Sequence, residues 1–297
     1  MNACVLHAVG DLRCEEVSTP QFGSDEVLVR VRACGVCGSD IPRVFEKGTY
    51  RFPTIPGHEF AGEVADIGNK ADRTLLGARV TVFPLIPCRA CPACAMGAYA
   101  QCDHYDYLGS RSDGAFAEYV RAPMWNLLPL PSGVDFIEGA MVEPAAVALH
   151  AVNQGSVQTG DTVLIVGAGP IGLLVAHWAQ IRGAGNVLLA DIDDAKLAFA
   201  RQLGFLNTFN PKAGNTTEWV RDFSAGGADV VIEASGSSAA YEQCMDSARM
   251  FGRVVLLGNP AGPMTLSQKA YWAILRKELK LSGSWNSVYG VEGRDEW

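Results

Sequence analysis

The stretch Val163-Leu-Ile-Val-Gly167-Ala-Gly-Pro-Ile-Gly172 decides the fold, because four apolar residues lead into a turn with three glycines spaced as GxGxxG. An apolar helix pattern follows and runs to Ile181. Between a strand and a helix, such glycines permit a tight turn, let a pyrophosphate approach the backbone and let the helix pack closely on the sheet. The N-terminus of the helix then offers unpaired N–H groups to the phosphates. The stretch therefore predicts a dinucleotide site with contacts from Gly167, Gly169, Pro170, Ile171 and Gly172.

Asp191 supports this interpretation, because it ends the next apolar run, 19 residues after Gly172. A carboxylate at this place accepts hydrogen bonds from the adenosine ribose and repels a 2′-phosphate, which favours NAD over NADP. Lys196 either covers the adenine side or is an ordinary solvated helix residue. The alternative for the whole motif is a glycine-rich turn that binds nothing.

The second half of the chain alternates buried apolar runs with helix patterns. The expected strands are Val163–Val166, Val187–Ala190, a weak one at Asn207–Phe209, Val230–Glu233, Val254–Leu257 and Leu279–Ser282. The expected helices are Ile171–Ile181, Ala195–Gln202 and Ala239–Met250. Six strands alternating with helices indicate an α/β fold with a doubly wound parallel sheet, a Rossmann domain.

The first half of the chain has short strand patterns broken by glycine and proline. The expected strands are Glu26–Arg32, Ala61–Ile67, Arg79–Phe83 and Phe116–Val120. They predict a β-rich, antiparallel, barrel-like domain. We therefore expect a first domain at residues 1–150, a dinucleotide-binding domain at residues 151–285 and a short closing segment at residues 286–297.

The composition excludes several classes of function. The chain has 297 residues, enough for two domains, and a net charge of −8 without a basic block, which argues against nucleic acid or an anionic membrane as a partner. The first residues lack the cationic start and apolar run of an export signal, and no apolar stretch is long and uninterrupted enough to span a membrane. We therefore expect a cytoplasmic protein, in which the nine cysteines favour metal binding over disulfides.

A structural metal site is predicted by four cysteines in the pattern C-x2-C-x2-C-x7-C. They are Cys88, Cys91, Cys94 and Cys102. Four thiolates satisfy the tetrahedral preference of zinc and leave no open position. An iron–sulfur cluster and unliganded surface thiols are the alternatives. The other cysteines outside the sites, Cys4, Cys14, Cys34 and Cys244, are interpreted as ordinary structural residues.

A second set of ligand types is scattered along the first half of the chain. Cys37-Gly-Ser39-Asp40 supplies a thiolate, His58-Glu59 an imidazole and a carboxylate, and Glu143 another carboxylate. A Cys/His/Glu set with a water is the open coordination that catalytic zinc requires. A structural cysteine and a helix-capping Glu143 are the alternatives for the single residues.

These motifs together resemble one known family. The run Gly57-His58-Glu59-Phe-Ala-Gly62-Glu-Val-Ala-Asp-Ile-Gly68 resembles the signature of the zinc-containing medium-chain alcohol and polyol dehydrogenases. The motif around Cys37, the four-cysteine lobe, Glu143-Pro144 and the glycine turn follow in the order of that family. The resemblance covers the whole chain and implies a GroES-like catalytic domain before the Rossmann domain.

The resemblance implies two zinc ions per chain, NAD as the cofactor and oxidation of an alcohol to a ketone. The catalytic zinc is expected at Cys37, His58, Glu59 and Glu143, with Glu59 exchanging with Glu143 or water. Ser39 is expected to bond the substrate hydroxyl and begin proton removal. The small-molecule substrate is expected to be a polyol or polyol phosphate.

Within the family, three runs most resemble the members that oxidise galactitol 1-phosphate to tagatose 6-phosphate. They begin at Cys37, Gly109 and Leu275. Unphosphorylated polyols of the sorbitol type and L-threonine are the alternative substrates. Arginine matches the geometry of phosphate, so the candidates for phosphate recognition are Arg43, Arg51 and Arg111, with Lys47 after them, and surface arginines without a ligand are the alternative.

The family resemblance also concerns the end of the chain. Relatives continue for roughly fifty residues beyond the sixth Rossmann strand, so residues 286–297 are expected to be the start of a truncated return to the catalytic domain, ending where a helix begins. A zinc- and NAD-binding protein made inert by truncation is the alternative from another class. Relatives usually pair through the edge of the cofactor sheet, so we expect a homodimer or a tetramer.

Overall fold

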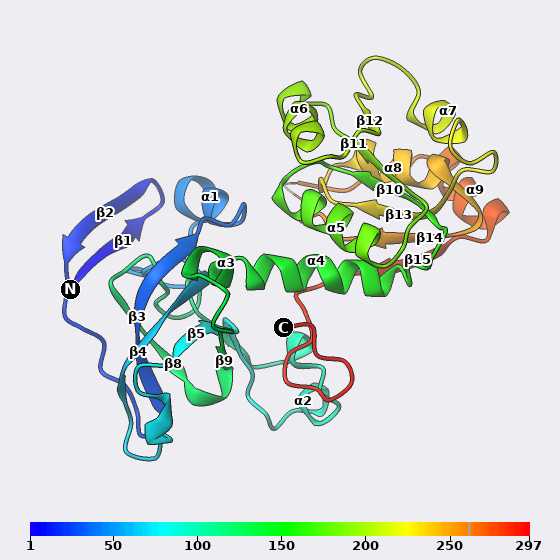
Figure 1. Ribbon diagram of the computed structural model, residues 1–297. Helices are drawn as coiled ribbons and strands as arrows, with labels where there is room; N and C mark the ends of the chain where they lie inside the picture. The colour runs from blue at the N-terminus through cyan, green and yellow to red at the C-terminus, as the bar shows by residue number, and fades with distance from the viewer. Residues whose placement is uncertain (261) are drawn as a thin grey trace. The chain divides into compact units, whose positions relative to one another are not determined.

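The computed structural model describes residues 1–260 and 262–297 and divides the chain into two compact units (Figure 1). Unit 1 comprises Met1–Pro144 and Val288–Trp297, and unit 2 comprises Ala145–Ser287. Helix α4 (Val142–Gln154) begins in unit 1 and continues in unit 2. Within the described residues, no helix combines the length and apolarity that crossing a bilayer requires.

Unit 2 is built on a six-stranded parallel sheet with the strand order β12-β11-β10-β13-β14-β15. The strands are β10 (Thr162–Val166), β11 (Asn186–Ala190), β12 (Thr208–Phe209), β13 (Ala228–Glu233), β14 (Ala248–Leu256) and β15 (Lys280–Gly283). The connecting helices are α5 (Pro170–Ile181), α6 (Asp194–Gln202), α7 (Thr216–Arg221), α8 (Ser238–Ser247) and α9 (Gln268–Lys277). The expected doubly wound sheet is confirmed, and its order reverses between β10 and β13, where such sheets bind ligands.

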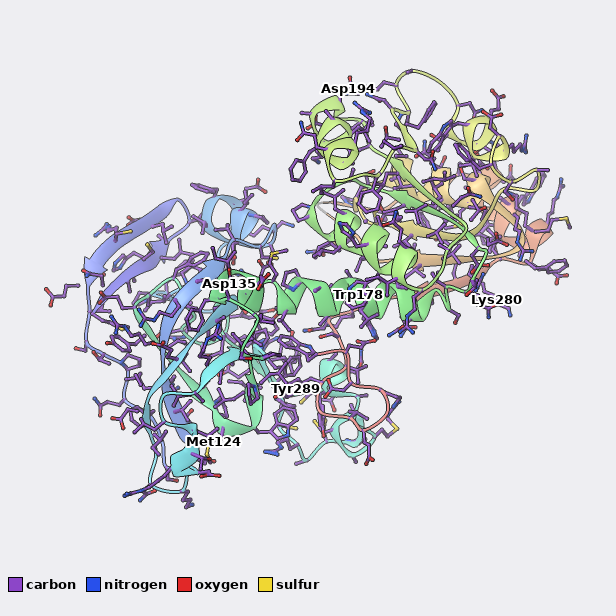
Figure 2. All side chains as sticks on the ribbon, in the orientation of Figure 1. Met124, Asp135, Trp178, Asp194, Lys280 and Tyr289 are labelled. Carbon is purple, nitrogen blue, oxygen red and sulfur yellow. The ribbon has the colours of Figure 1, made fainter. Side chains whose placement is uncertain are left out.

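Both faces of this sheet are covered, which explains the continuous apolar runs in the sequence. In β10, Val163 and Ile165 pack in one core with residues of α5 and α6. The alternate residues Leu164 and Val166 pack in a second core with residues of α7, α8 and α9. Trp178 of α5, labelled in Figure 2, donates from its indole nitrogen to the carbonyl of Ala145 at 2.9 Å and so ties α5 to α4.

Helix α8 is shorter than the sequence pattern predicts. Ser237 caps its N-terminus by accepting a hydrogen bond from an amide of the first turn, and it ends at Ser247 instead of Met250. The residues from Ala248 onward belong to β14, where Ala248 pairs with Ala228. The prediction was wrong at this end because helix and strand follow each other without a turn residue between them.

Unit 1 contains a five-stranded antiparallel sheet in the order β8-β3-β4-β5-β9, the N-terminal hairpin β1–β2 and the short pair β6–β7. The strands are β1 (Asn2–Ala8), β2 (Asp11–Glu16), β3 (Glu26–Gly35), β4 (Glu59–Ile67), β5 (Arg79–Val82), β6 (Leu85–Ile86), β7 (Asp106–Tyr107), β8 (Tyr119–Pro123) and β9 (Leu127–Pro129). Strand β8 begins later than the predicted Phe116, because the backbone of Phe116 bonds Cys4 and Pro56 instead of the neighbouring strand. The core of this five-stranded sheet contains Val27, Val29 and Val64.

Short helices join these strands. They are α1 (Asp40–Pro42), the π-helical turn η1 (Arg43–Lys47), the 3-10 turns η2 (Arg73–Leu75), η3 (Tyr99–Gln101) and η4 (Met124–Asn126), and the helices α2 (Pro92–Ala95) and α3 (Phe136–Ala140). Helix α3 starts with a capping box, in which Asp135 and Glu138 each bond the backbone N–H of the other (Figure 2).

The last ten residues belong to unit 1 and contain no helix among them. The segment is held by Tyr289, labelled in Figure 2, which stacks on Phe83 with ring centroids 4.5 Å apart. Its hydroxyl donates to the carbonyls of Trp125 at 2.9 Å and Leu127 at 3.2 Å. Trp297 meets Phe83 edge-on, so the segment closes an aromatic cluster of unit 1.

Candidate functional site

Three of the expected ligands meet in unit 1. Cys37 follows β3, His58 precedes β4 and Glu59 is the first residue of β4. Because β3 and β4 are antiparallel and Gly35 lies opposite Glu59, the end of one strand lies beside the start of the other. One ligand atom from each of the three residues lies within 4.8 Å of the other two. The fold therefore gathers a sulfur, a nitrogen and an oxygen donor into one cluster.

Burial controls the ionisation of this cluster. It lowers the pKa of the His58 imidazole to about 3, with the charge of Arg43 as a further cause, so the ring is neutral and keeps a free lone pair. Burial, together with the nearby charge of Glu59, raises the pKa of the Cys37 thiol to about 12. The pKa of the Glu59 carboxyl is also raised, mainly by burial. A cation among these groups would favour their ionised forms, so the cluster is suited to a metal ion.

Asp40 and Arg43 lie beside the histidine. Asp40 is 2% exposed, accepts a hydrogen bond from the Cys37 N–H at 3.2 Å and forms an ion pair with Arg43. Its Oδ1 lies 3.7 Å from Nδ1 of His58, a buried nitrogen that has no hydrogen-bond partner among the described residues. A carboxylate beside a ligand histidine holds the orientation of the ring. Asp40 is therefore placed to position both Cys37 and His58.

Glu143 lies in the first turn of α4 and is 5% exposed. Its Oε1 accepts a hydrogen bond from the Tyr107 hydroxyl at 3.3 Å, and the Tyr107 ring meets the His58 ring edge-on at 5.6 Å. Burial, together with the charge of Glu59, raises the pKa of Glu143 to about 8. Glu143 thus lies next to the cluster, outside the set of three whose ligand atoms are within 4.8 Å of one another.

In the sequence, Ser39 lies between Cys37, which belongs to the cluster, and Asp40, which contacts it. It is half-buried, and its backbone N–H donates to Sγ of Cys37 at 3.5 Å. This contact keeps the serine next to the thiol.

The four-cysteine lobe forms a second cluster. One sulfur from each of its four residues lies within 4.8 Å of the others, with 4.0 Å between Cys88 and Cys94 and 3.9 Å between Cys91 and Cys102. Tetrahedral zinc with Zn–S bonds of about 2.3 Å would place its sulfurs about 3.8 Å apart. Backbone N–H groups lower the pKa of Cys91 to about 6, whereas burial raises that of Cys94 to about 12. This closed set of sulfurs fits a structural zinc ion.

The glycine turn of unit 2 has the geometry that its motif requires. Gly167 has a φ of +115°, a conformation that favours glycine. A Cβ on Gly172 would lie 1.9 Å from the carbonyl oxygen of Gly167, so helix α5 can start this close to β10 only with glycine there. A Cβ on Gly169 would meet nothing within 4 Å, so space is open before the helix that begins with Pro170 and Ile171.

Asp191 is joined to this turn. Its Oδ2 accepts a hydrogen bond from the N–H of Ala168 at 2.8 Å, and its Oδ1 accepts one from Asp193 at 2.9 Å. The ammonium of Lys196 lies 3.7 Å from Oδ2, and this lysine side chain is 50% exposed. The carboxylate therefore fixes the turn and lies beside the expected cofactor contacts.

The candidate phosphate ligands differ in their exposure and in the ion pairs that their charged groups already form. Arg43 is 16% exposed and is ion-paired with Asp40. Arg51 lies 2.9 Å from the carboxylate of Asp113 and is about half-exposed. Lys47 ends η1 and is exposed.

The Arg111 guanidinium is held differently from these three. Its central carbon lies over the rings of Tyr50 and Tyr105, at 4.2 and 4.3 Å from their centroids. Its Nε is buried and has no hydrogen-bond partner among the described residues.

Sequence reasoning missed three residues that complete these sites. Asp40 and Tyr107 support the cluster at His58. The acid directly after Ser39 was a sequence signal for Asp40, and Tyr107 had none. Glu233 ends β13 and accepts hydrogen bonds from the N–H groups of Ser235 and Gly236, which shapes the loop next to the glycine turn.

Two family models match the chain. The alcohol dehydrogenase GroES-like domain matches residues 23–132, and the zinc-binding dehydrogenase model matches residues 170–296.

Three curated relatives are similar over most of the chain. The galactitol 1-phosphate 5-dehydrogenase of Escherichia coli is 35% identical, over 100% of this chain and 86% of the relative. The sorbitol dehydrogenase of Bacillus subtilis is 33% identical over 88% of this chain and 76% of its own. The L-threonine 3-dehydrogenase of Symbiobacterium thermophilum is 36% identical over 95% of this chain and 79% of its own.

Solved structures agree with these relatives. Galactitol-1-phosphate dehydrogenase from Escherichia coli superposes with a TM-score of 0.94 at 34% identity, covering 100% of this chain and 86% of that one. A zinc-binding dehydrogenase of Sinorhizobium meliloti bound to NADP has a TM-score of 0.91 at 34% identity, covering 97% of this chain and 85% of that one. An alcohol dehydrogenase of Escherichia coli complexed with NADH has a TM-score of 0.89 at 28% identity, covering 97% and 84%.

Proposed function

The chain belongs to the zinc-dependent medium-chain alcohol and polyol dehydrogenases, and from this premise we propose that it oxidises a secondary hydroxyl of a polyol phosphate to a ketone with NAD. Galactitol 1-phosphate is the first candidate substrate, with tagatose 6-phosphate as its product. The observation that carries the proposal is the buried cluster of Cys37, His58 and Glu59, whose mixed donors suit an open catalytic zinc site.

Cys37, His58 and Glu59 would hold the catalytic zinc, with Glu143 able to take the place of Glu59 or of a water. When bound, the ion supplies a Lewis acid that favours the ionised form of the substrate hydroxyl. The chain supplies the positioning, because Asp40 bonds the Cys37 amide and lies beside His58. A low pKa keeps His58 neutral, which is the form that can bind a metal.

The proton of the substrate hydroxyl needs an acceptor near the cluster. We assign the first step to the hydroxyl of Ser39, which lies two residues after Cys37 and whose amide contacts the cysteine sulfur. Glu143 and Tyr107 form a hydrogen-bonded pair on the histidine side and would help to exclude water there.

The four cysteines of the lobe would hold a second, structural zinc, which gives two zinc ions per chain. Their sulfur spacing of 3.9–4.0 Å supports this assignment over unliganded thiols.

NAD is the proposed cofactor, bound at the turn Gly167–Gly172, where it supplies the hydride acceptor. The open space beside Gly169 and the N-terminus of α5 are suited to the pyrophosphate. Asp191 would accept hydrogen bonds from the adenosine ribose and repel a 2′-phosphate, although Lys196 beside it offers a cation that NADP could use.

For the substrate phosphate we propose Arg111 first, Arg51 second and Arg43 third. The Arg111 guanidinium lies over two tyrosine rings and forms no ion pair among the described residues, so it can receive an anion without breaking one. Ring contacts run from Tyr105 to Tyr107, with centroids 6.4 Å apart, and from Tyr107 to His58, with centroids 5.6 Å apart. They connect the surroundings of Arg111 to the cluster that contains His58.

Other substrates within the family are the nearest alternatives, because sorbitol and L-threonine dehydrogenases are also similar to this chain. A protein that binds zinc and NAD without turnover is the alternative of another class. We place the protein in the cytoplasm and infer a homodimer formed along β15, the edge strand of the parallel sheet, with a tetramer as the alternative.

Zinc analysis of purified protein and two matched variants tests the site assignment. We expect two zinc ions in the parent chain, with one lost together with all activity in Cys37→Ser. Cys94→Ser is expected to lose the other zinc and stability. A Cys37→Ser protein that keeps two zinc ions and full turnover would refute the proposed catalytic site.

A further inference from the structure

The N-terminal hairpin brings together two cysteines that neither proposed zinc site uses. In the antiparallel pair β1–β2, Cys4 lies directly opposite Cys14. Their Sγ atoms are 2.7 Å apart. The sulfurs of the four-cysteine lobe, which are arranged around a common centre, stand 3.9 and 4.0 Å apart by comparison. The hairpin sulfurs are thus closer to the about 2.05 Å of a disulfide bond than to the spacing of a metal site.

The backbone of the hairpin allows this bond without moving. Directly opposed residues of antiparallel strands have Cα atoms about 4.5 or 5.5 Å apart. Both values lie within the about 4.4–6.8 Å that a disulfide spans. The strands are fixed on both sides of the pair, since the N–H of Val17 donates to the carbonyl of Met1 at 2.8 Å and the Leu6 and Thr54 backbones exchange two hydrogen bonds. The sulfurs are therefore held together by the fold.

The two thiols differ in their access to solvent. Cys14 is exposed, whereas Cys4 is half-buried. Burial and the contact with Cys14 raise the pKa of the Cys4 thiol to about 11, so the thiol form dominates there. A small oxidant in solution therefore reaches Cys14 first.

We propose that Cys4 and Cys14 form a reversible disulfide with a small-molecule disulfide, such as oxidised glutathione, as the oxidant. The Cys14 thiolate attacks one sulfur of glutathione disulfide, which forms a mixed disulfide and releases one glutathione thiolate. Cys4 gives up its proton to solvent and attacks the Cys14 sulfur, which releases the second glutathione. Two protein thiols are oxidised and one glutathione disulfide is reduced to two thiols.

This bond lies outside the zinc ligands, so zinc-loaded protein can form it with both metal sites intact. It would also join the strands next to an element of the proposed active site. The hairpin turn donates from the Gly10 N–H to the carbonyl of Val44 at 2.7 Å, within the turn η1 that begins at Arg43.

The test compares the folded and unfolded chain. Zinc-loaded protein is equilibrated with a series of reduced-to-oxidised glutathione ratios, once in buffer and once in concentrated urea. The reaction is quenched with acid, the free thiols are alkylated and the protein is digested. Because trypsin cuts after Arg13, the disulfide joins the peptides 1–13 and 14–30, which mass spectrometry detects as one species.

We expect the linked peptides to form in the folded protein at a ratio at least about tenfold more reducing than in urea, because the fold holds the sulfurs together. Zinc content should stay at the value before oxidation. In Cys14→Ser the linked species should be absent, whereas Cys34→Ser, a half-buried cysteine elsewhere in unit 1, should behave like the parent. Linkage that is no easier in the folded protein than in urea, or linkage that draws zinc out of the protein, would overturn the proposal.

Discussion

Replacing Arg111 by alanine tests the substrate assignment, because among the candidate arginines this one lies over two aromatic rings and forms no ion pair with a described residue. A hydrogen bond between a charged pair contributes about 1.5–3 kcal/mol, and each 1.4 kcal/mol changes an affinity about tenfold. Arg111 is only partly buried, so we take the lower half of this range and expect KM for galactitol 1-phosphate to rise about 10–40-fold. The contact binds substrate and transition state alike, so kcat should change little.

The assay measures initial rates of NADH formation with galactitol 1-phosphate and with galactitol. Arg111→Lys keeps the charge but loses the planar fork and should fall between parent and alanine variant. Arg121→Ala is the matched control, because that arginine is about half-exposed and lies 3.6 Å from Glu26 on the β8 side of the sheet. Equal rises in KM for both substrates would show that Arg111 shapes the site by packing and does not bind phosphate.

Loss of the two ring contacts also has a cost in stability that must be separated from the effect on binding. Cation–π contacts at exposed sites contribute about 0.5–1 kcal/mol each, so Arg111→Ala should lower the free energy of unfolding by about 1–2 kcal/mol. Rates are therefore compared at a temperature where urea unfolding shows both proteins to be folded.

Three further changes test the cofactor turn and the closing segment. In Gly172→Ala the new Cβ would meet the carbonyl of Gly167 at 1.9 Å, so titration should show NAD affinity reduced at least about tenfold; normal affinity would contradict the packing of this turn. In Asp191→Asn the ratio of kcat/KM for NAD over NADP should fall about tenfold, because the charge that repels a 2′-phosphate is lost, and an unchanged ratio would remove this residue from cofactor selection. In Tyr289→Phe two backbone carbonyls lose their donor, so urea unfolding should show a loss of about 1–2 kcal/mol with zinc content unchanged; unaltered stability would mean that this hydroxyl does not hold the segment.

The sequence predicted the centre of the parallel sheet well because β10, β11 and β13 are buried along nearly their whole length. A run such as Val163–Val166 is apolar throughout, and the glycine turn after it fixes the start of the next helix. Element ends were harder to predict. At Ala248 a helix passes directly into a strand, and the apolar residues after it fit either pattern.

The candidate metal ligands could be predicted from chemistry, since only a few residue types bind zinc. The residues that surround these ligands could not be predicted in this way. Asp40 stands beside Ser39 in the sequence, but its role depends on His58, which the pairing of β3 with β4 brings near. The position of Asp40 also changes the interpretation of Arg43. In the sequence Arg43 is a candidate phosphate ligand, whereas in the fold it forms an ion pair with Asp40.

The contact between Cys4 and Cys14 could not be predicted from the sequence either. From the sequence alone, both are interpreted as ordinary structural residues. Only the register of the hairpin places them opposite each other.

The most direct test of the account is the initial rate of reduction of NAD by purified, zinc-loaded protein with four substrates side by side. These are galactitol 1-phosphate, galactitol, sorbitol and L-threonine, each with NAD and with NADP. We expect a clear preference for galactitol 1-phosphate with NAD. Absence of turnover on every substrate, in protein that holds two zinc ions and binds NAD, would contradict it.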